Sequence, residues 1–100
     1  MKDLKKSEPA QTYTIGHTYT LKTNLHVRVG AGRTYTVKRR SALTADDRKN
    51  SISDSVKAIL KSGTEVLCQD LIVMHTGSVW MKIPSGWICA MGPNGKTFVH

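Results

Sequence analysis

The feature that most constrains the fold is a series of short apolar segments separated by turn-forming residues. In residues 25–29 and 64–70, apolar and polar side chains alternate with the two-residue period of a β-strand that buries one face. Sequences rich in glycine, proline, serine or asparagine follow at residues 30–32, 61–63, 75–78, 84–86 and 92–95. This spacing predicts an all-β domain, a small barrel or sandwich of short antiparallel strands.

Other segments add to this pattern. Residues 79–83 are predicted to form a strand with Trp80 and Lys82 on one face and Met81 and Ile83 on the other. Residues 34–37 fit either a short extended piece or one helical turn, and residues 71–74 either prolong or bend the strand before them. Further strands are expected at residues 13–21, 56–60, 87–90 and 97–99, with a helical turn as the alternative at residues 56–60.

The expected domain covers residues 13–100, because a chain of 100 residues has room for one small domain. Residues 1–12 mix charged residues with serine and proline and show no apolar period, so we expect a tail or linker there. Residues 39–55 show neither a strand nor a helix period and are expected to form a long polar surface loop. Within this loop, Thr44 is a candidate cap for a single helical turn.

Positive charge dominates the first half of the chain. The 15 basic and 7 acidic residues give a net charge of +8, and no acid lies between Glu8 and Asp46. A field of one sign favours anionic partners, such as nucleic acid, anionic lipid or a cell-wall polymer, although a solvated basic surface remains the alternative. No apolar run approaches the ~20 residues of a membrane span. The first residues lack the apolar stretch of a signal peptide, so we expect no export by that route.

The pattern of potentially reactive residues argues against catalysis by this chain. The four histidines do not have metal-ligand spacing to one another, and neighbouring Asp46 and Asp47 do not by themselves make a glycosidase pair. Cys68 lies inside a strand pattern without an adjacent activating group. We therefore expect no catalytic residue, no metal site and no cofactor. Cys68 and Cys89 are expected to be free thiols, with one disulfide as the alternative.

Four segments, in the same order along the chain, resemble bacterial SH3-like (SH3b) domains. They are the opening strand and turn Asn24-Leu25-His26-Val27-Arg28-Val29-Gly30-Ala31-Gly32, the turn and strand Lys61-Ser62-Gly63-Thr64-Glu65-Val66, the strand Val79-Trp80-Met81-Lys82-Ile83, and the segment Ser85-Gly86-Trp87-Ile88. The sequence departs from the family pattern in reading Gly-Ala-Gly where the family has Gly-Pro-Gly. It also departs in its longer insertion at residues 39–55 and in continuing past Trp87.

The resemblance is closest to the C-terminal cell-wall-binding domains of phage endolysins and N-acetylmuramoyl-L-alanine amidases. It implies an SH3-like barrel of five to seven short antiparallel strands that directs an attached or partner lytic enzyme, such as an upstream catalytic domain, to peptidoglycan. The implied ligand is the peptide stem or cross-bridge, or an anionic wall polymer. The implied place of action is the extracellular cell wall, after a cytoplasmic stage if a phage encodes the chain. Because one scaffold hosts many roles, the resemblance alone does not establish the function.

The residues suited to such a ligand are aromatic and basic. Trp80 and Trp87 are expected on neighbouring strands across a tight turn, with Tyr35 near the Gly30–Gly32 turn. Arg28, Arg33 and Lys82 are candidates to meet carboxylates. We expect Trp80→Ala to weaken wall binding without unfolding the domain, although core or rim packing is the alternative role for both tryptophans.

Two other function classes remain open at this point. One is a protein-interaction or oligomerisation module. The other is a single-stranded nucleic-acid binder that uses the basic face of residues 22–40.

Overall fold

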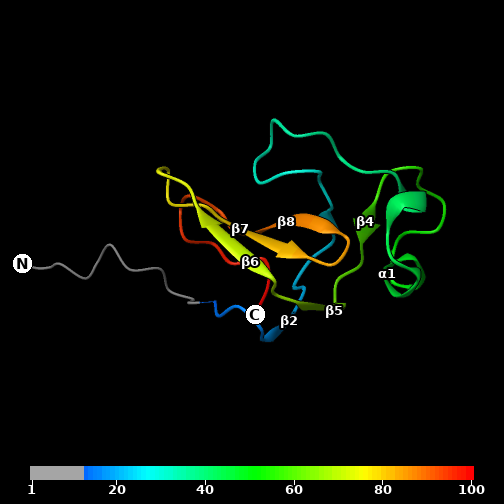
Figure 1. Ribbon diagram of the computed structural model, residues 1–100, viewed down its shortest axis with the longest axis horizontal. Coiled ribbons are helices and arrows are strands. Elements are labelled where there is room, and N and C mark those ends of the chain that lie inside the picture. The colour runs from blue at the N-terminus through cyan, green and yellow to red at the C-terminus, as the bar shows by residue number, and fades with distance from the viewer. Residues whose placement is uncertain (1–12) are drawn as a thin grey trace, which may run out of the picture.

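A computed structural model describes residues 13–100 (Figure 1). The predicted tail, residues 1–12, lies outside the described residues. The strands are β2 (Thr18–Thr20), β3 (Leu25–His26), β4 (Ile59–Leu60), β5 (Glu65–Leu67), β6 (Asp70–Val73), β7 (Val79–Ile83) and β8 (Gly86–Met91). A 3₁₀ turn, η1 (Arg40–Ala42), and a short helix, α1 (Ala45–Lys49), lie between β3 and β4. The predicted all-β class is confirmed.

The strands form three small antiparallel sheets. β2 pairs with β5, β3 pairs with β4, and β6, β7 and β8 form a three-stranded sheet. The sheets are not closed into a barrel, in contrast to the barrel that the sequence predicted. Several strands are only two or three residues long, and isolated bridges such as Leu21 with Val99 and Arg28 with Trp87 connect the sheets.

The β7–β8 hairpin follows its predicted pattern closely. Met81, Ile83 and Ile88 point into the hydrophobic core and are fully buried. The register jumps between Val79 and Trp80, which leaves Ala90 as an extra residue in β8. This bulge lets consecutive residues of β8, including Ala90, both face the core, a departure from strict alternation.

The core lies between this sheet and the two smaller ones. Strands β3, β4, β5, β7 and β8 and the segments beside them supply its members, which are Tyr13, Leu21, Leu25, Val27, Leu43, Ala58, Leu60, Val66, Cys68, Val79, Met81, Ile83, Ile88, Ala90, Met91 and Val99. Tyr13 closes one end, where its hydroxyl donates to the carbonyl oxygens of Val99 (2.9 Å) and Ala90 (3.1 Å). Burial, with smaller contributions from Tyr19 and Cys89, raises the pKa of Tyr13 to about 12.

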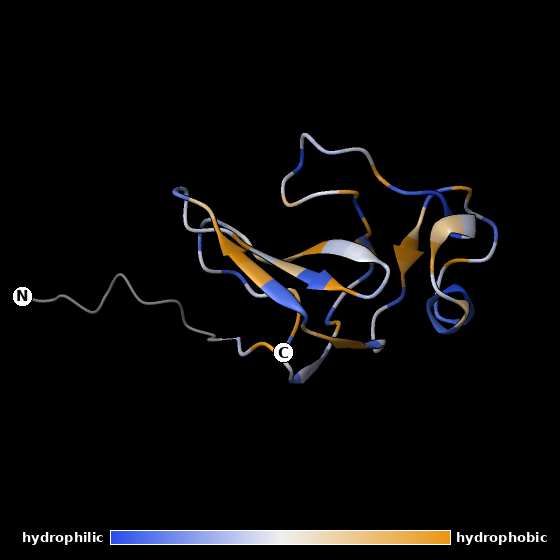
Figure 2. Cartoon of the chain, viewed as in Figure 1, coloured by the Kyte–Doolittle hydropathy of each residue, from blue (hydrophilic) through white to orange (hydrophobic). Residues whose placement is uncertain are grey.

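The segment 39–55 is more ordered than the polar surface loop that the sequence predicted. The Thr44 hydroxyl accepts a hydrogen bond from the Asp47 backbone N–H (3.2 Å), so the predicted cap of a single helical turn is confirmed. The helix is mainly hydrophilic (Figure 2), yet its Asp47 is buried, as is Leu43 in the segment before it. The Ser85 hydroxyl donates to the Asp47 carboxylate and ties α1 to the β7–β8 turn.

Other boundaries differ from the predictions in length. The expected strand at residues 25–29 is only β3, after which Arg28 forms isolated bridges to Val37 and Trp87. Residues 32–35 form a turn, which is closed by the Tyr35 backbone N–H donating to the carbonyl oxygen of Gly32 (3.2 Å), and only Val37 in the segment 34–37 forms a β-bridge. Within residues 13–100, no helix is long and apolar enough to cross a membrane.

Gly86 permits the closest approach between two backbone segments. A Cβ atom at Gly86 would lie 2.7 Å from the Arg28 carbonyl oxygen and 2.9 Å from a methyl group of Val27. Its φ of 147° is also a conformation that residues with side chains rarely adopt. Gly86 therefore lets β8 pair with residues 27–28.

We expect Gly86→Ala to lower the free energy of unfolding by about 3 kcal/mol, because the substitution adds both backbone strain and a backbone clash. Gly95→Ala is the matched control, since Gly95 also has a positive φ (84°) but a Cβ atom there would have no other atom within 4 Å. The control should cost about 1 kcal/mol. Urea unfolding of both variants measures the difference. Equal losses in the free energy of unfolding would show that the close backbone approach at Gly86 does not add to the cost of the substitution.

Candidate functional site

The outer face of the β6–β7–β8 sheet carries the aromatic residues of the candidate site. The register places Trp80 opposite Cys89 and Lys82 opposite Trp87, so these four side chains share one face. Met81 and Ile88 point to the opposite face, into the core. The period of two therefore separates a core face from a potential ligand face in the same hairpin.

Arg28 joins this face to the loop of residues 30–36. Its backbone exchanges hydrogen bonds with Trp87 (2.8 and 2.9 Å), which aligns it with the edge of β8. Its guanidinium Nη1 donates to the carbonyl oxygens of Tyr35 (2.9 Å) and Arg33 (3.3 Å). Arg28 is therefore a positioning residue that holds the loop beside the sheet.

The loop itself is shaped by the Gly30–Gly32 turn. A Cβ atom at Gly30 would lie 2.6 Å from the ring of Tyr35, so the ring packs over this glycine. Tyr35 remains 49% exposed. With the backbone held by Arg28, the loop presents the exposed Arg33 side chain toward the sheet.

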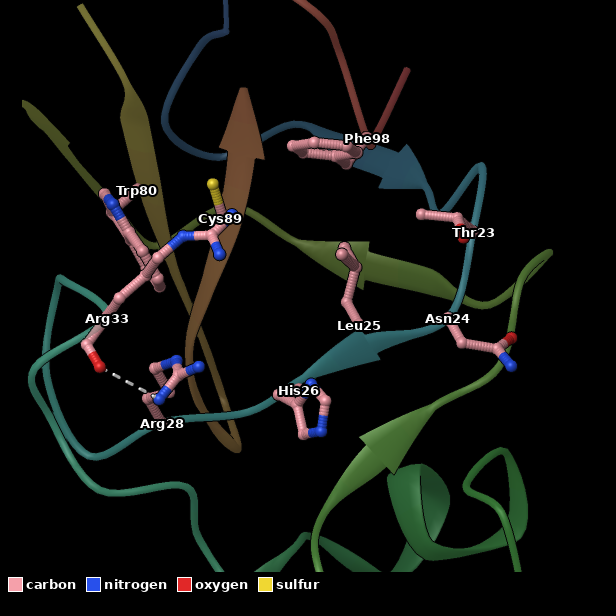
Figure 3. A pocket seen from close by; sticks show the side chains of 9 residues that line it. All are labelled: Thr23, Asn24, Leu25, His26, Arg28, Arg33, Trp80, Cys89 and Phe98. Atoms are coloured by element: carbon pink, nitrogen blue, oxygen red, sulfur yellow. Dashed lines mark hydrogen bonds between the residues drawn. The ribbon is translucent and has the colours of Figure 1, made fainter. Parts of the chain in front are cut away.

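A pocket of about 190 Å³ lies between the loop, β3 and β8 (Figure 3). We call it the central pocket, and its lining residues are Thr23, Asn24, Leu25, His26, Arg28, Arg33, Trp80, Cys89 and Phe98. Figure 3 shows the Arg33 side chain reaching toward Trp80 and Cys89, with Arg28 hydrogen-bonded beside the Arg33 backbone and Phe98 across the opening. The pocket thus combines cationic groups with an aromatic wall.

A second pocket continues from the central pocket. It has a volume of about 360 Å³ and shares Arg33, Trp80 and Cys89 with its neighbour. We call it the apolar pocket because Met74 and Pro93 line it, and its other lining residues are Gly32, His75, Thr76 and Ser78. The two pockets form one groove that passes over Trp80.

Charge is unevenly distributed around this groove. Among the described residues that line the two pockets, none is acidic. Asp46, Asp47 and Glu65 instead line a separate pocket near α1 and β5. An anion entering the groove would therefore meet Arg28 and Arg33 without a competing carboxylate in the lining.

Burial and nearby cations shift the pKa values of two titratable groups in the central pocket, His26 and Cys89. Burial lowers the pKa of His26, and the positive charges of Arg28 and Lys57 lower it further. Burial raises the pKa of the Cys89 thiol, although Arg33 favours the thiolate and opposes this shift. His26 is therefore mainly neutral at pH 7, and the permanent positive charge of the pocket comes from its two arginines.

The structure brings together three of the six residues that the sequence selected for binding. Arg28, Arg33 and Trp80 line the central pocket. Trp80 is only 4% exposed, so it does not form an open aromatic platform. Truncation of a buried tryptophan costs about 3–5 kcal/mol, so the expectation that Trp80→Ala leaves the fold intact needs correction.

The other three predicted residues lie next to the groove and do not line either pocket. Lys82 donates through Nζ to the side-chain oxygen of Gln69 (3.2 Å). Trp87 is half-buried between Lys82 and Arg28 in the strand register. Tyr35 packs over the loop at Gly30.

Sequence reasoning missed His26, Cys89 and Phe98 as lining residues. The alternation that places Arg28 opposite Leu25 also places His26 on the ligand face, so this residue had a local signal. The same period links Cys89 to Trp87. Phe98 had no local signal, because it reaches the pocket through pairing of the last residues with residues 20–22.

Cys68 and Cys89 are both free, which agrees with the expected thiol state, and burial raises the pKa of each. In the part of the chain that the structure describes, no group of three or more histidine, cysteine or acidic residues is placed to hold a metal ion. Comparisons with protein-family models, curated proteins and solved structures found no match.

We expect an NMR titration to give His26 a pKa below its usual 6.5. Lys57→Gln should raise that pKa by removing a positive charge, whereas the charge-matched control Lys49→Gln should leave it unchanged. The unfolded chain binds the His26 proton more readily than the folded chain does. The contribution of His26 to the free energy of unfolding is therefore fully present above pH 6.5 and is lost as the pH falls through the folded-state pKa. An unshifted His26 would contradict the electrostatic description of the pocket.

Proposed function

We propose that this chain is a non-catalytic module that binds bacterial cell-wall peptidoglycan and directs an attached or partner lytic enzyme to it. The observation that carries this proposal is the groove over Trp80, in which an apolar pocket opens directly onto the arginines of the central pocket. A wall peptide carries small apolar side chains next to carboxylates. The two halves of the groove match these two kinds of group.

The carboxylate would meet Arg33, whose exposed side chain lines both pockets. A guanidinium suits this task because its planar donors can bind both oxygens of a carboxylate. Methyl groups of the peptide would lie against Met74 and Pro93, beside Trp80. The wall ligand would therefore be fixed by charge at one point and by apolar contact at another.

The SH3-like motifs support the same assignment by their positions. The opening motif, residues 24–32, supplies Asn24, His26 and Arg28 to the central pocket. The motif at residues 79–83 supplies Trp80, and the chain after Gly86 supplies Cys89. Two segments that are distant in the sequence and resemble one family therefore line opposite sides of one groove.

We expect Arg33→Gln to weaken binding to purified sacculi about tenfold, because it removes a charge-assisted contact with the ligand. Co-sedimentation with teichoic-acid-free peptidoglycan at near-physiological salt measures this change. Arg39→Gln is the matched control, since Arg39 is also exposed and carries the same charge but does not line either pocket. It should bind like the unaltered chain.

Several outcomes would contradict the proposal. If sacculi from several Gram-positive bacteria do not retain the unaltered chain, the proposed wall-binding function is wrong. Equal loss in both arginine variants would mean that diffuse attraction by the net charge of +8 accounts for retention. Tight dimerisation without wall affinity would favour an interaction module, and preferential competition by a single-stranded oligonucleotide would favour nucleic-acid binding.

A further inference from the structure

A third pocket extends the groove beyond the central pocket. It has a volume of about 540 Å³ and is lined by Lys22, Thr23, Gly95, Lys96, Thr97 and Phe98. We call it the lysine pocket. It shares Thr23 and Phe98 with the central pocket, so the two are adjacent around the Phe98 side chain.

Long-range pairing builds this pocket from the two ends of the described chain. The Lys22 backbone N–H donates to the Phe98 carbonyl oxygen (2.8 Å), and Leu21 bridges Val99. The Lys22 ammonium donates to the Thr97 hydroxyl, which holds this cation at the pocket wall. The backbone pairing therefore fixes one lysine of the pocket.

The second lysine comes from the preceding turn. The Gly92 N–H donates to the Lys96 carbonyl oxygen (2.9 Å), and Gly95 adopts the positive φ (84°) that the turn requires. The Asn94 side-chain oxygen accepts a hydrogen bond from the Lys96 backbone N–H (3.1 Å). These contacts order the backbone and leave the exposed Lys96 side chain at the pocket.

The three pockets form a continuous cationic path. None of the described residues that line them is acidic. Arg28 and Arg33 supply positive charge in the central pocket, and Lys22 and Lys96 supply it beyond Phe98. We call the two arginines and the two lysines the two charge pairs, each of which is a pair of like positive charges. A ligand with one negative group would contact only one of these two charge pairs.

We propose that the wall ligand is a polyanion with one negative group in the central pocket and a second in the lysine pocket. This proposal deepens the proposed wall-binding function and rests on it. The uncharged stretch between the two groups would cross Thr23 and Phe98, the residues that both pockets share. Arginine recognises the first group through directed hydrogen bonds, whereas lysine attracts the second as a point charge.

Two kinds of wall material offer this chemistry. The negative groups can be phosphodiesters of an anionic wall polymer or carboxylates of neighbouring peptide stems. The first carries its charges in series along one chain, and the second carries them on neighbouring stems of one glycan strand, so either would gain affinity from simultaneous contact with the two charge pairs. The choice of probe therefore has to distinguish phosphodiesters from carboxylates as the negative groups that bind.

The test compares poly(glycerol phosphate) and poly-L-glutamate of similar length with the monomer glycerol 3-phosphate, using isothermal titration calorimetry over a range of salt concentrations. We expect Lys96→Gln to weaken binding of the preferred polymer about tenfold and to reduce its salt slope by about one. Binding of the monomer should change little. Lys49→Gln removes the same charge on α1, away from the three pockets, and should have no such effect.

Preference for poly(glycerol phosphate) would identify phosphodiesters as the source and would replace peptidoglycan by an anionic wall polymer as the ligand of the proposed function, whereas preference for poly-L-glutamate would identify carboxylates. Equal effects of Lys96→Gln and Lys49→Gln on the polymer would overturn the two-pocket ligand. If sacculi are retained through Arg33 while Lys96→Gln changes neither retention nor polymer binding, only the lysine-pocket proposal fails. If neither sacculi nor polymers bind the unaltered chain, both proposals fail, and tighter binding of an oligo-dT of similar length would likewise overturn the wall ligand.

Discussion

The groove depends on the pairing of Arg28 with Trp87 at the edge of β8. Two backbone hydrogen bonds of 2.8 and 2.9 Å join these residues, and Gly86 leaves room for the Arg28 carbonyl oxygen. The pairing brings the chain after β3 alongside the three-stranded sheet. From that position the Arg28 guanidinium can hold the loop through the carbonyl oxygens of Arg33 and Tyr35. A single close backbone contact therefore determines both the shape of the loop and one wall of the groove.

The β7–β8 hairpin directs one face into the core and the other toward the groove. Met81 and Ile88 are fully buried in the core, while Trp80 and Cys89 on the other face line the groove. Because the same strands fix both sets of side chains, the groove face is built on the most extensively paired part of the fold. The cationic groups come instead from the loop and from the chain ends, which lie along its borders. The apolar side chains of the groove thus lie on paired strands, whereas its charged side chains lie on the loop and the chain ends.

Local patterns predicted the regular part of the fold well. The period of two located β7 and the inward direction of Met81, and the Thr44 side chain marked the start of α1. The polar composition of residues 39–55 concealed the burial of Asp47, because that burial depends on a hydrogen bond from Ser85, 38 residues away. Barrel closure was also beyond local patterns. It depends on how short strands meet at their edges, and here isolated bridges replace continuous ladders.

The sequence by itself determined the β-rich class, the inward and outward faces of the central hairpin, and the excess of positive charge. These properties follow from side-chain periodicity, turn chemistry and composition, which act over a few neighbouring residues. Only the tertiary structure decided that Arg33 and Trp80 share a groove and that Lys22 and Lys96 extend it. Those residues meet through pairing between distant segments, such as Leu21 with Val99. Side-chain periodicity does not predict such contacts, because they form only when separate strands pack around one core.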